Sequence, residues 1–531
     1  MRKLLPLLAC LAVAIPAGCG SSSQGSGAPT PAAATPTGPF QWLVSTSGPP
    51  PSVAQENRNP GTTAWRLPGP ADDVGGLVQG NVAGYVSAPA VLPGQIERIF
   101  VNAPGSHYVR IRVFRMGWYG GTGGREMLVS HRLPLRDQPP CTHRSSTGLT
   151  ECAWHPTLSF QIPTGLPSGV YIAKLSAPTG QADTLFVVRS ISPQPLLAQL
   201  PTSTYQAYNA WGGDSLYPGG ADPVGLTGTT QGVEVSYDRP YDSNTGAGQF
   251  FARDVAMVRF LERYGYPVSY TTSEAVDADP GQLQGHRALL DFGHSEYWSQ
   301  RQADGFTAAR DAGTNLAFLS SDALGWRVRY EPATSAASQP GAAAHLIVSY
   351  KEHASADPNP GQSTGLFPNG GAPLTGSAYV GCITPRLNTS GPPTYRYYLW
   401  APNPQLQPSW LFAGTGVSSD TRIAGIQGYE LDLRTPASPP GTSLVGYGHA
   451  TCMRAPPGEP VPGPGQNLGE ATVYRASSGA LVFSTGTLGW ELGLEPVPSA
   501  SPDAPRAPDS RVVAMTRNLL SRMLSGPAGG R

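Results

Sequence analysis

Apolar runs and amphipathic segments alternate along residues 196–319, and this alternation constrains the fold more than any other feature of the sequence. The amphipathic segments, residues 249–264 and 300–312, have helical periodicity, and each is followed by a glycine that can end a helix. The apolar runs have the length of buried strands and cover residues 196–200, 268–270, 288–290 and 315–319. Strands that alternate with helices predict a doubly wound α/β domain with a parallel sheet.

The chain before this region has a different pattern. Residues 107–113 and 169–175 alternate apolar and polar side chains with a period of two, and no helical period accompanies them. We therefore predict a β-sandwich domain over residues 39–192 and the α/β domain over residues 193–531. Strand-like runs at residues 345–350, 421–433, 471–475 and 480–484 predict further strands and β-rich insertions in the second domain. A loop is expected before the run 288–290, and Asp509 or Ser510 is expected to cap a last helix.

The N-terminus has the features of an export signal. Two basic residues precede an apolar run over residues 4–15, and small residues precede Cys19. This pattern predicts a lipoprotein signal peptide over residues 1–19, with Cys19 lipidated on the outer face of the cell membrane. Pro16 departs from the usual lipobox, so simple secretion is the alternative. Residues 20–38 are rich in Ser, Gly, Pro and Ala, which is typical of a flexible linker.

Composition limits the partners. The 35 basic and 35 acidic residues balance and form no long run, which gives no electrostatic reason to expect nucleic acid. No later stretch reaches the ~18 apolar residues that span a bilayer, so membrane attachment is expected only through the lipid. Four cysteines follow the signal, which suits an oxidising compartment. Of three possible pairings, proximity favours Cys141 with Cys152 and Cys382 with Cys452.

Polar residues follow the predicted strand 288–290 at the point where α/β sheets bind ligands. His294 and Glu296 lie in this stretch, just before the predicted helix. The alternatives are a hydrogen-bonded structural histidine and a glutamate that caps the helix. Asp322, at another predicted strand end, either binds a ligand or only ends its strand. No Gly-x-Ser-x-Gly motif occurs near the strand ends and no Cys occurs in residues 196–330, so a Ser or Cys nucleophile is not expected.

Several sequence blocks, taken in order, resemble the large (beta) subunit family of N,N-dimethylformamidase. The resemblance spans roughly residues 95–525 and is carried by FRMGWYGG, TYQAYNAWGG, VSYDRPYD, GHSEYWS and ALVFSTGTLGWELGL. It implies an α/β domain similar to class I glutamine amidotransferases, following a β-rich domain. It also implies hydrolysis of the C–N bond of small formamides at a mononuclear Fe(III) ion held by two tyrosinates and a glutamate.

Carried over block by block, the resemblance assigns metal ligands and catalytic groups. Tyr208 and Glu296 match as ligands, and the second tyrosine is Tyr241 or Tyr237, with Tyr241 preferred. His294 would either hold a metal ligand in place through a hydrogen bond or act as an acid–base group, and Asn209 would be a candidate hydrogen-bond donor to the substrate oxygen. Without the resemblance, Tyr205, Tyr208, Trp211 and Tyr217 would be interpreted as core and interface aromatics.

Three functions compete. The first is an exported, lipid-anchored amidohydrolase that acts on a small linear amide. The second is a catalytically inactive surface lipoprotein with a binding or structural role, and the third is a sugar enzyme of the glutamine amidotransferase-like fold. The presence of all three ligand types favours the first. The characterised family enzyme works with a separate small subunit and without a lipid anchor, so the assembly here, a homo-oligomer or a two-subunit enzyme, stays open.

Overall fold

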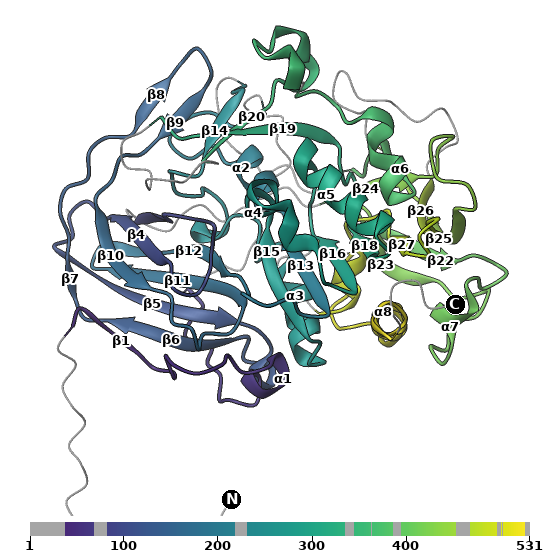
Figure 1. Ribbon diagram of the computed structural model, residues 1–531, viewed down its shortest axis with the longest axis horizontal. Coiled ribbons are helices and arrows are strands. Elements are labelled where there is room, and N and C mark those ends of the chain that lie inside the picture. The colour runs from purple at the N-terminus through teal and green to yellow at the C-terminus, as the bar shows by residue number, and fades with distance from the viewer. Residues whose placement is uncertain are drawn as a thin grey trace, which may run out of the picture. The chain divides into compact units, whose positions relative to one another are not determined.

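A computed structural model describes residues 38–67, 82–217, 231–334, 345–362, 364–385, 395–452, 468–495, 501 and 503–525 (Figure 1). Residues 39–531 form one compact unit. The predicted signal peptide with Cys19, and all of the predicted linker except Gly38, lie outside the described residues. Within the described residues, no helix is both long enough and apolar enough to cross a membrane.

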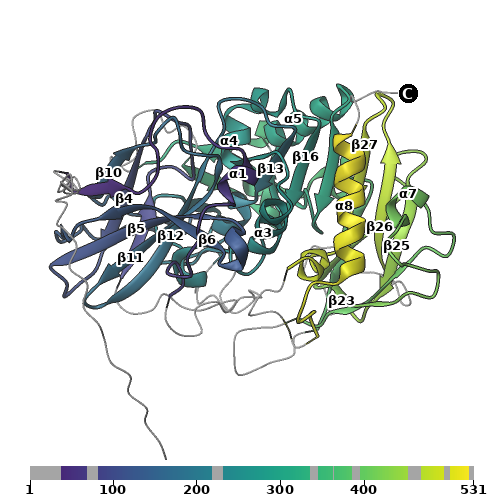
Figure 2. The same ribbon diagram turned by 90° about the horizontal axis from the view of Figure 1, so that it is seen from below.

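The N-terminal part is a β-sandwich, as the period-two pattern predicts (Figure 2). Its strands are β1 (Phe40–Trp42), β2 (Ala83–Val86), β3 (Ala90–Val91), β4 (Ile96–Asn102), β5 (Tyr108–Met116), β6 (Gly124–Ser130), β7 (Leu133–Pro134), β10 (Pro156–Gln161), β11 (Gly169–Ala177) and β12 (Gly180–Val188). One sheet has the order β1-β6-β5-β11-β12-β3 with β7 beside β5, and the other has the order β10-β4-β2. Alternate residues of β5, namely Val109, Ile111 and Val113, pack with Ile99 and Val101 of β4 between the sheets.

The C-terminal part is built on a mixed nine-stranded sheet. Its strands are β13 (Leu196–Leu200), β15 (Val268–Thr272), β16 (Ala288–Phe292), β18 (Asn315–Leu319), β22 (Tyr398–Pro402), β23 (Ile423–Gln427), β25 (Ser443–His449), β26 (Leu468–Arg475) and β27 (Leu481–Ser484). The spatial order is β15-β13-β16-β18-β27-β26-β25-β22-β23, and the first five strands are parallel. When the five parallel strands are numbered by their order in the chain, their spatial order is 2-1-3-4-5. The winding direction therefore changes between β13 and β16. Doubly wound sheets bind ligands at such a point.

Helices cover both faces of the parallel strands. They are α3 (Val255–Arg263), α4 (Ser273–Ala278), α5 (Gln300–Asp311) and α8 (Ser510–Leu524). On one face Leu196 of β13 belongs to a core with Val258 of α3 and Leu519 of α8. On the other face its neighbour Leu197 belongs to a core with Phe306 of α5. The predicted doubly wound α/β arrangement is therefore present, and the chain as a whole is a strand-rich mixed α/β protein.

Insertions between these elements are rich in short strands, as predicted. One small sheet has the order β14-β20-β19-β17, and β21 pairs with β24 in a separate two-stranded sheet; the further pair of β8 with β9 belongs to the N-terminal part. The bounds are β8 (Thr142–Arg144), β9 (Leu149–Glu151), β14 (Glu234–Ser236), β17 (Tyr297–Ser299), β19 (Trp326–Glu331), β20 (Leu346–Val348), β21 (Ala378–Ile383) and β24 (Glu430–Leu433). The short helices are α1 (Val53–Glu56), α2 (Thr202–Tyr208), α6 (Ala372–Thr375) and α7 (Ser409–Phe412).

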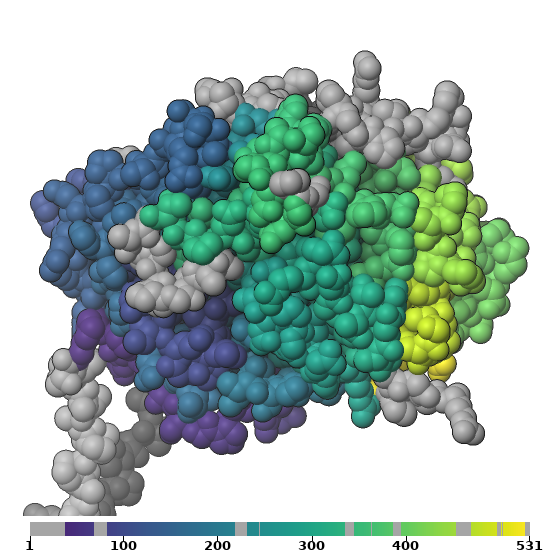
Figure 3. All heavy atoms as spheres, turned by 45° about the horizontal axis from the view of Figure 1, so that its top comes forward, coloured from purple at the N-terminus to yellow at the C-terminus, as the bar shows by residue number. Residues whose placement is uncertain are grey.

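The sandwich packs directly against the α/β part (Figure 3). Arg115 of β5 donates to both carboxylate oxygens of Glu262 on α3, at 2.8 and 2.9 Å, and neither side chain is exposed. Phe114 of β5 and Phe260 of α3 lie in one continuous core. The predicted domain boundary falls between β12 and β13, and the residues on its two sides share this core.

Three local predictions differ from the structure. Helix α3 begins at Val255 instead of Gln249, because residues 249–254 form turns. Residues 273–278 form helix α4, where a loop was expected, because six residues are too few to show a helical period. The single strand expected over residues 421–433 is divided into β23 and β24 at Gly428, whose φ is 137°.

Other predictions are confirmed. Helix α5 covers residues 300–311 of the predicted 300–312, and α8 begins after Asp509, whose side chain accepts from the N–H of Arg511. Disulfides join Cys141 to Cys152 and Cys382 to Cys452, the pairing that proximity favours. The second bond closes a loop in the β-rich insertions next to β24.

Candidate functional site

The candidate site lies where the winding direction of the sheet changes. Strand β13 leads into α2, whose last residue is Tyr208, and β16 leads into the loop that carries His294 and Glu296. The N–H of Glu296 donates to Oγ1 of Thr204 on α2, at 3.1 Å, which ties the two segments together. Ser299, not Glu296, caps α5, since its side chain accepts from the N–H of Gln302 in a reciprocal capping box. The Glu296 carboxylate is therefore not needed to cap the helix.

Two phenols and one carboxylate converge at this point. Oη of Tyr208 donates to Oε2 of Glu296 at 2.8 Å, and Oη of Tyr217 donates to Oε1 at 2.7 Å. The two phenol oxygens are 2.8 Å apart, and their rings stack with centroids separated by 4.4 Å. Tyr297 donates to the phenol oxygen of Tyr217 at 2.7 Å. We call Tyr208, Tyr217 and Glu296 the tyrosine–glutamate cluster.

His294 lies between two carboxylates beside this cluster. Its Nε2 is 3.3 Å from Oε2 of Glu296 and 3.3 Å from Oε2 of Glu430, and all three side chains are buried. On the other side of the ring, Nδ1 is 3.2 Å from Oε1 of Gln249 and 3.3 Å from the hydroxyl of Tyr429. Contacts on both nitrogens fix the ring plane, so Nε2 is directed toward the two carboxylates.

Burial and charge give the titratable groups different proton affinities. Burial acts to lower the pKa of His294, but the charges of Glu430 and Glu296 raise it to about 9. Burial also acts to raise the pKa of Glu296, but hydrogen bonding and charge from His294 bring that pKa below its usual value. Burial raises the pKa of Glu430, and His294 offsets this only in part. Carboxyl groups whose pKa values are separated in this way are typical of acid–base sites.

The phenols hold their protons tightly in the absence of a cation. Burial, followed by the charge of Glu296, raises the pKa of Tyr208 and of Tyr217 well above the ordinary value. Lys351, which is 4% exposed, places Nζ 3.4 Å from the ring centroid of Tyr217 and acts to lower the pKa of Glu296. Among the described residues, no group of three or more His, Cys, Asp or Glu side chains is arranged to hold a metal ion. A metal here would therefore need the phenol oxygens as ligands.

The structure brings together some of the predicted site residues and separates others. Tyr208, Glu296 and His294 are adjacent, whereas Tyr241 lies in another buried group, with its ring 6.1 Å from that of Tyr205. Hydrogen bonding to Gln206 acts to lower the pKa of Tyr241, but burial raises it above its usual value. Tyr217 is therefore the second tyrosine at Glu296.

Tyr237 belongs to the same buried group as Tyr208, and Asn209 directly follows Tyr208 in the chain, but the hydrogen bonds of the Asn209 side chain lead to another loop. Burial, followed by the charges of Tyr330 and Glu274, raises the pKa of Tyr237. The Asn209 amide donates to Pro240 O at 2.9 Å and accepts from the N–H of Asp242 at 3.2 Å. Asn209 thus joins two loops.

Three residues of the site, Tyr217, Glu430 and Lys351, are not identifiable as site residues from the sequence. Tyr217 was considered only as a core aromatic, and Glu430 and Lys351 were not considered. Glu430 follows Glu296 by 134 residues and reaches the site through the pairing of β24 with β21. The only local signal for Glu430 in the sequence is its place next to Tyr429, as a charged residue at the start of a partly apolar strand.

A family model described as N,N-dimethylformamidase beta subunit-like, C-terminal, matches residues 110–504. The chain belongs to this family. No curated protein matches the sequence. Membership supports a hydrolase related to dimethylformamidase and is consistent with a metal cofactor.

Proposed function

We propose that this protein hydrolyses the C–N bond of a small linear amide, with an iron ion held by Tyr208, Tyr217 and Glu296. The observation that carries the proposal is the meeting of two phenol oxygens and one carboxylate within 2.7–2.8 Å of one another. The alternative, a binding protein without catalysis, gives no reason for two phenol oxygens and a carboxylate to converge beside a histidine flanked by carboxylates.

The donor set fits a hard trivalent cation. Phenolate and carboxylate oxygens are hard ligands, and two phenolates with one carboxylate carry three negative charges. The raised pKa values of Tyr208 and Tyr217 belong to the cluster without a cation, and a bound cation reverses that effect. When bound, the ion would polarise the amide carbonyl and acidify a water molecule.

His294 and Glu430 are placed to handle the protons of the reaction. Hydrolysis joins a water oxygen to the carbonyl carbon, breaks the C–N bond and transfers a proton to the departing nitrogen. Nε2 of His294 can hold that proton, because two carboxylates stabilise the imidazolium form. The carboxylate of Glu430, whose pKa is raised, can accept the proton that the attacking water loses and return it to Nε2 of His294, 3.3 Å away.

We also propose that the protein works outside the cytoplasm, attached by lipid at Cys19. The predicted signal peptide supports export, and the two disulfides agree with an oxidising compartment. Membership of a beta subunit-like family is consistent with a further subunit as partner.

The test is to purify the chain from Pro39 onward, measure bound metals by mass spectrometry, and assay N,N-dimethylformamide hydrolysis. We expect about one iron per chain, and we expect Glu296→Gln to lose both metal and activity. Metal binding depends on residues of this chain alone, so it decides the question even if activity needs a second subunit. A wild-type protein that stays metal-free after incubation with iron would overturn the proposal and favour the binding protein.

A further inference from the structure

The compact body of the protein begins at one end of the β-sandwich. The backbone oxygen of Pro39 accepts from the N–H of His131 at 3.0 Å, and β1 then runs antiparallel to β6, with Phe40 opposite Ser130. Figure 1 shows this end, marked by β7, on the side of the sandwich that points away from the α/β part. A tether that precedes Pro39 therefore joins the body at this end.

Exposed basic side chains gather at the same end. The two segments beside it, residues 104–110 and 131–137, carry three exposed arginines and two exposed histidines but only one exposed carboxylate, Asp137. The chain as a whole has 35 basic and 35 acidic residues, so this excess is local. We call Arg110, Arg132 and Arg136 the basic face. None of the three is paired with a carboxylate of the described residues, whereas Arg112 of β5 is paired at 2.6 Å.

The strand register places these arginines on the outer side of the sandwich. Val109 of β5 is paired with Leu133 of β7, and both side chains lie in the core. Because successive side chains of a strand point to opposite sides, Arg110 and Arg132 point outward. Cζ of Arg132 is 4.5 Å from the ring centroid of Tyr108, which is also on the outer side. Neighbouring like charges on paired strands repel each other, and an anionic partner would relieve that repulsion.

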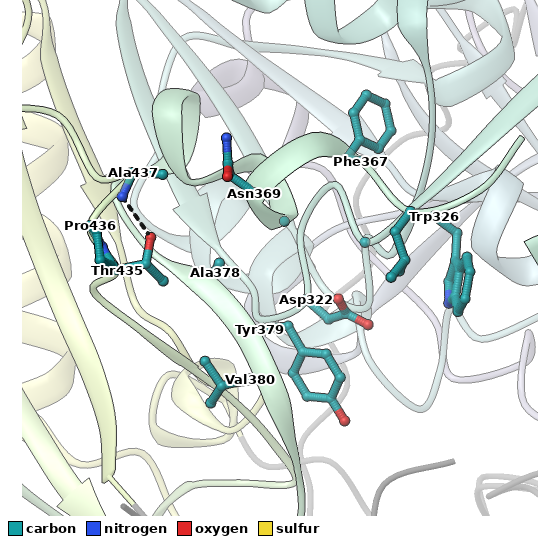
Figure 4. A pocket seen from close by; sticks show the side chains of 13 residues that line it. Asp322, Trp326, Phe367, Asn369, Ala378, Tyr379, Val380, Thr435, Pro436 and Ala437 are labelled. Atoms are coloured by element: carbon teal, nitrogen blue, oxygen red, sulfur yellow. Dashed lines mark hydrogen bonds between the residues drawn. The ribbon is translucent and has the colours of Figure 1, made fainter. Parts of the chain in front are cut away.

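Two cavities elsewhere in the chain are less suited to an extended anionic partner. A cavity of about 440 Å³ is lined by Arg301, Arg327 and Arg329, but Asp277 lines it as well, and Arg329 is paired with two carboxylates at 2.7 and 3.0 Å. A cavity of about 670 Å³ in the α/β part has mostly apolar walls, and the charged side chain among its described lining residues is Asp322 (Figure 4). The basic face differs from both because its arginines are exposed and unpaired.

We propose that the basic face lies against the anionic lipid headgroups of the membrane to which the protein is tethered. This inference rests on the proposed lipid attachment at Cys19. Residues 20–38 separate Cys19 from Pro39, and at full extension they span roughly 70 Å, so the tether keeps the body near the bilayer. Each arginine near an anionic bilayer strengthens binding roughly fivefold, and a tether makes such weak contacts effective by making them intramolecular.

The contact would orient the whole molecule. Strand β5 starts at the basic face and ends at the α/β part, where Arg115 is bound to Glu262 of α3. From Tyr108 to Arg115 a strand rises roughly 23 Å. With the basic face on the bilayer, the sandwich acts as a spacer, and the α/β part with its candidate site is held on the side away from the membrane.

The test attaches the chain from Cys19 onward to vesicles through a maleimide lipid. The other four cysteines of this chain are in disulfides, so Cys19 is the thiol that reacts. The vesicles contain phosphatidylcholine alone or phosphatidylcholine mixed with phosphatidylglycerol. Hydrogen exchange of residues 104–110 and 131–137 is then measured by mass spectrometry. One variant combines Arg110→Gln, Arg132→Gln and Arg136→Gln. The control combines Arg475→Gln, Arg506→Gln and Arg522→Gln, at exposed arginines of the α/β part, and changes the net charge equally.

We expect exchange of both segments to be at least about twofold slower on the phosphatidylglycerol vesicles in the wild type and the control, and not in the basic-face variant. Equal exchange of the wild type on the two kinds of vesicle overturns the inference, and so does an equal loss of protection in both variants. The maleimide lipid supplies the anchor, so this result is independent of native lipidation. Mass spectrometry of the N-terminus of the protein from its own cells tests that separately, and an unmodified Cys19 there would refute the proposed lipid attachment.

Discussion

Glu491 lies with Asp254 and Asp291 behind the loop that carries His294, and Glu491→Gln should change how stability depends on pH. Oε1 of Glu491 accepts from the N–H of Gly293 at 2.8 Å, and a glutamine oxygen can keep that bond. Burial, with smaller contributions from neighbouring charges, raises the pKa of Glu491 to about 8 and that of Asp254 well above its ordinary value. Burial likewise raises the pKa of Asp291 to about 8.

The sign follows from proton binding. A carboxyl group whose pKa is raised by folding is protonated in the folded state and ionised in the unfolded state at intermediate pH. Its contribution to the free energy of unfolding is complete at pH values below the pKa of the unfolded state, and this contribution is lost as pH rises toward 8. For Glu491 the shift is about 3.5 pH units, which converts to about 5 kcal/mol across this interval. Glu491→Gln removes this ionisation, so the variant should gain stability relative to the wild type as pH rises from 5 to 9.

The assay is urea unfolding between pH 5 and 9, followed by circular dichroism, with a chelator present so that cations do not contribute. The control is Glu352→Gln, because the Glu352 side chain is exposed and loses little solvation on folding. Between pH 5 and 9, we expect the difference in free energy of unfolding between Glu491→Gln and wild type to change by at least about 2 kcal/mol. The same difference between Glu352→Gln and wild type should stay constant. Parallel curves for wild type and Glu491→Gln would refute the reasoning.

Three further results are expected. Glu262→Gln should lower the free energy of unfolding by about 3–5 kcal/mol, because Arg115 loses its buried partner. Glu126→Gln, at the partly exposed Arg112–Glu126 pair, should lower it by less than about 1 kcal/mol. Equal losses for the two variants in urea unfolding would contradict this. Ser299→Ala removes the capping side chain of α5 and should cost about 1 kcal/mol in the same assay. Glu430→Gln should lower kcat by roughly 10²–10⁴-fold with little change in KM and full metal content, and steady-state kinetics with metal analysis checks this.

The fold was predictable where each strand and helix carries its own signal. Strands β13, β16 and β18 are buried on both faces, so each appears in the sequence as a mostly apolar run with a single polar residue, Gln199, Asp291 or Asn315. Helix α2 was not predicted, because its seven residues are all buried although four of them are polar, so the sequence shows no separate apolar and polar faces.

The site was predictable only in part for a related reason. Glu296 follows a recognisable strand, so its position at the edge of the sheet could be inferred from the sequence. Tyr217 and Glu430 reach the same point from an irregular segment and from an insertion, and tertiary packing alone brings them there. Tyr241 matched the expected ligand type, but the structure surrounds it with Tyr205 and Gln206.

The most direct test of the account compares Tyr217→Phe with Tyr241→Phe. Each substitution removes one hydroxyl from a buried aromatic residue, and only the first removes a proposed ligand. The measurement is iron per chain together with the visible absorption that tyrosinate bound to Fe(III) gives. We expect Tyr217→Phe to lose both signals and Tyr241→Phe to keep them. Retention of iron and colour by Tyr217→Phe, or their loss only in Tyr241→Phe, would contradict it.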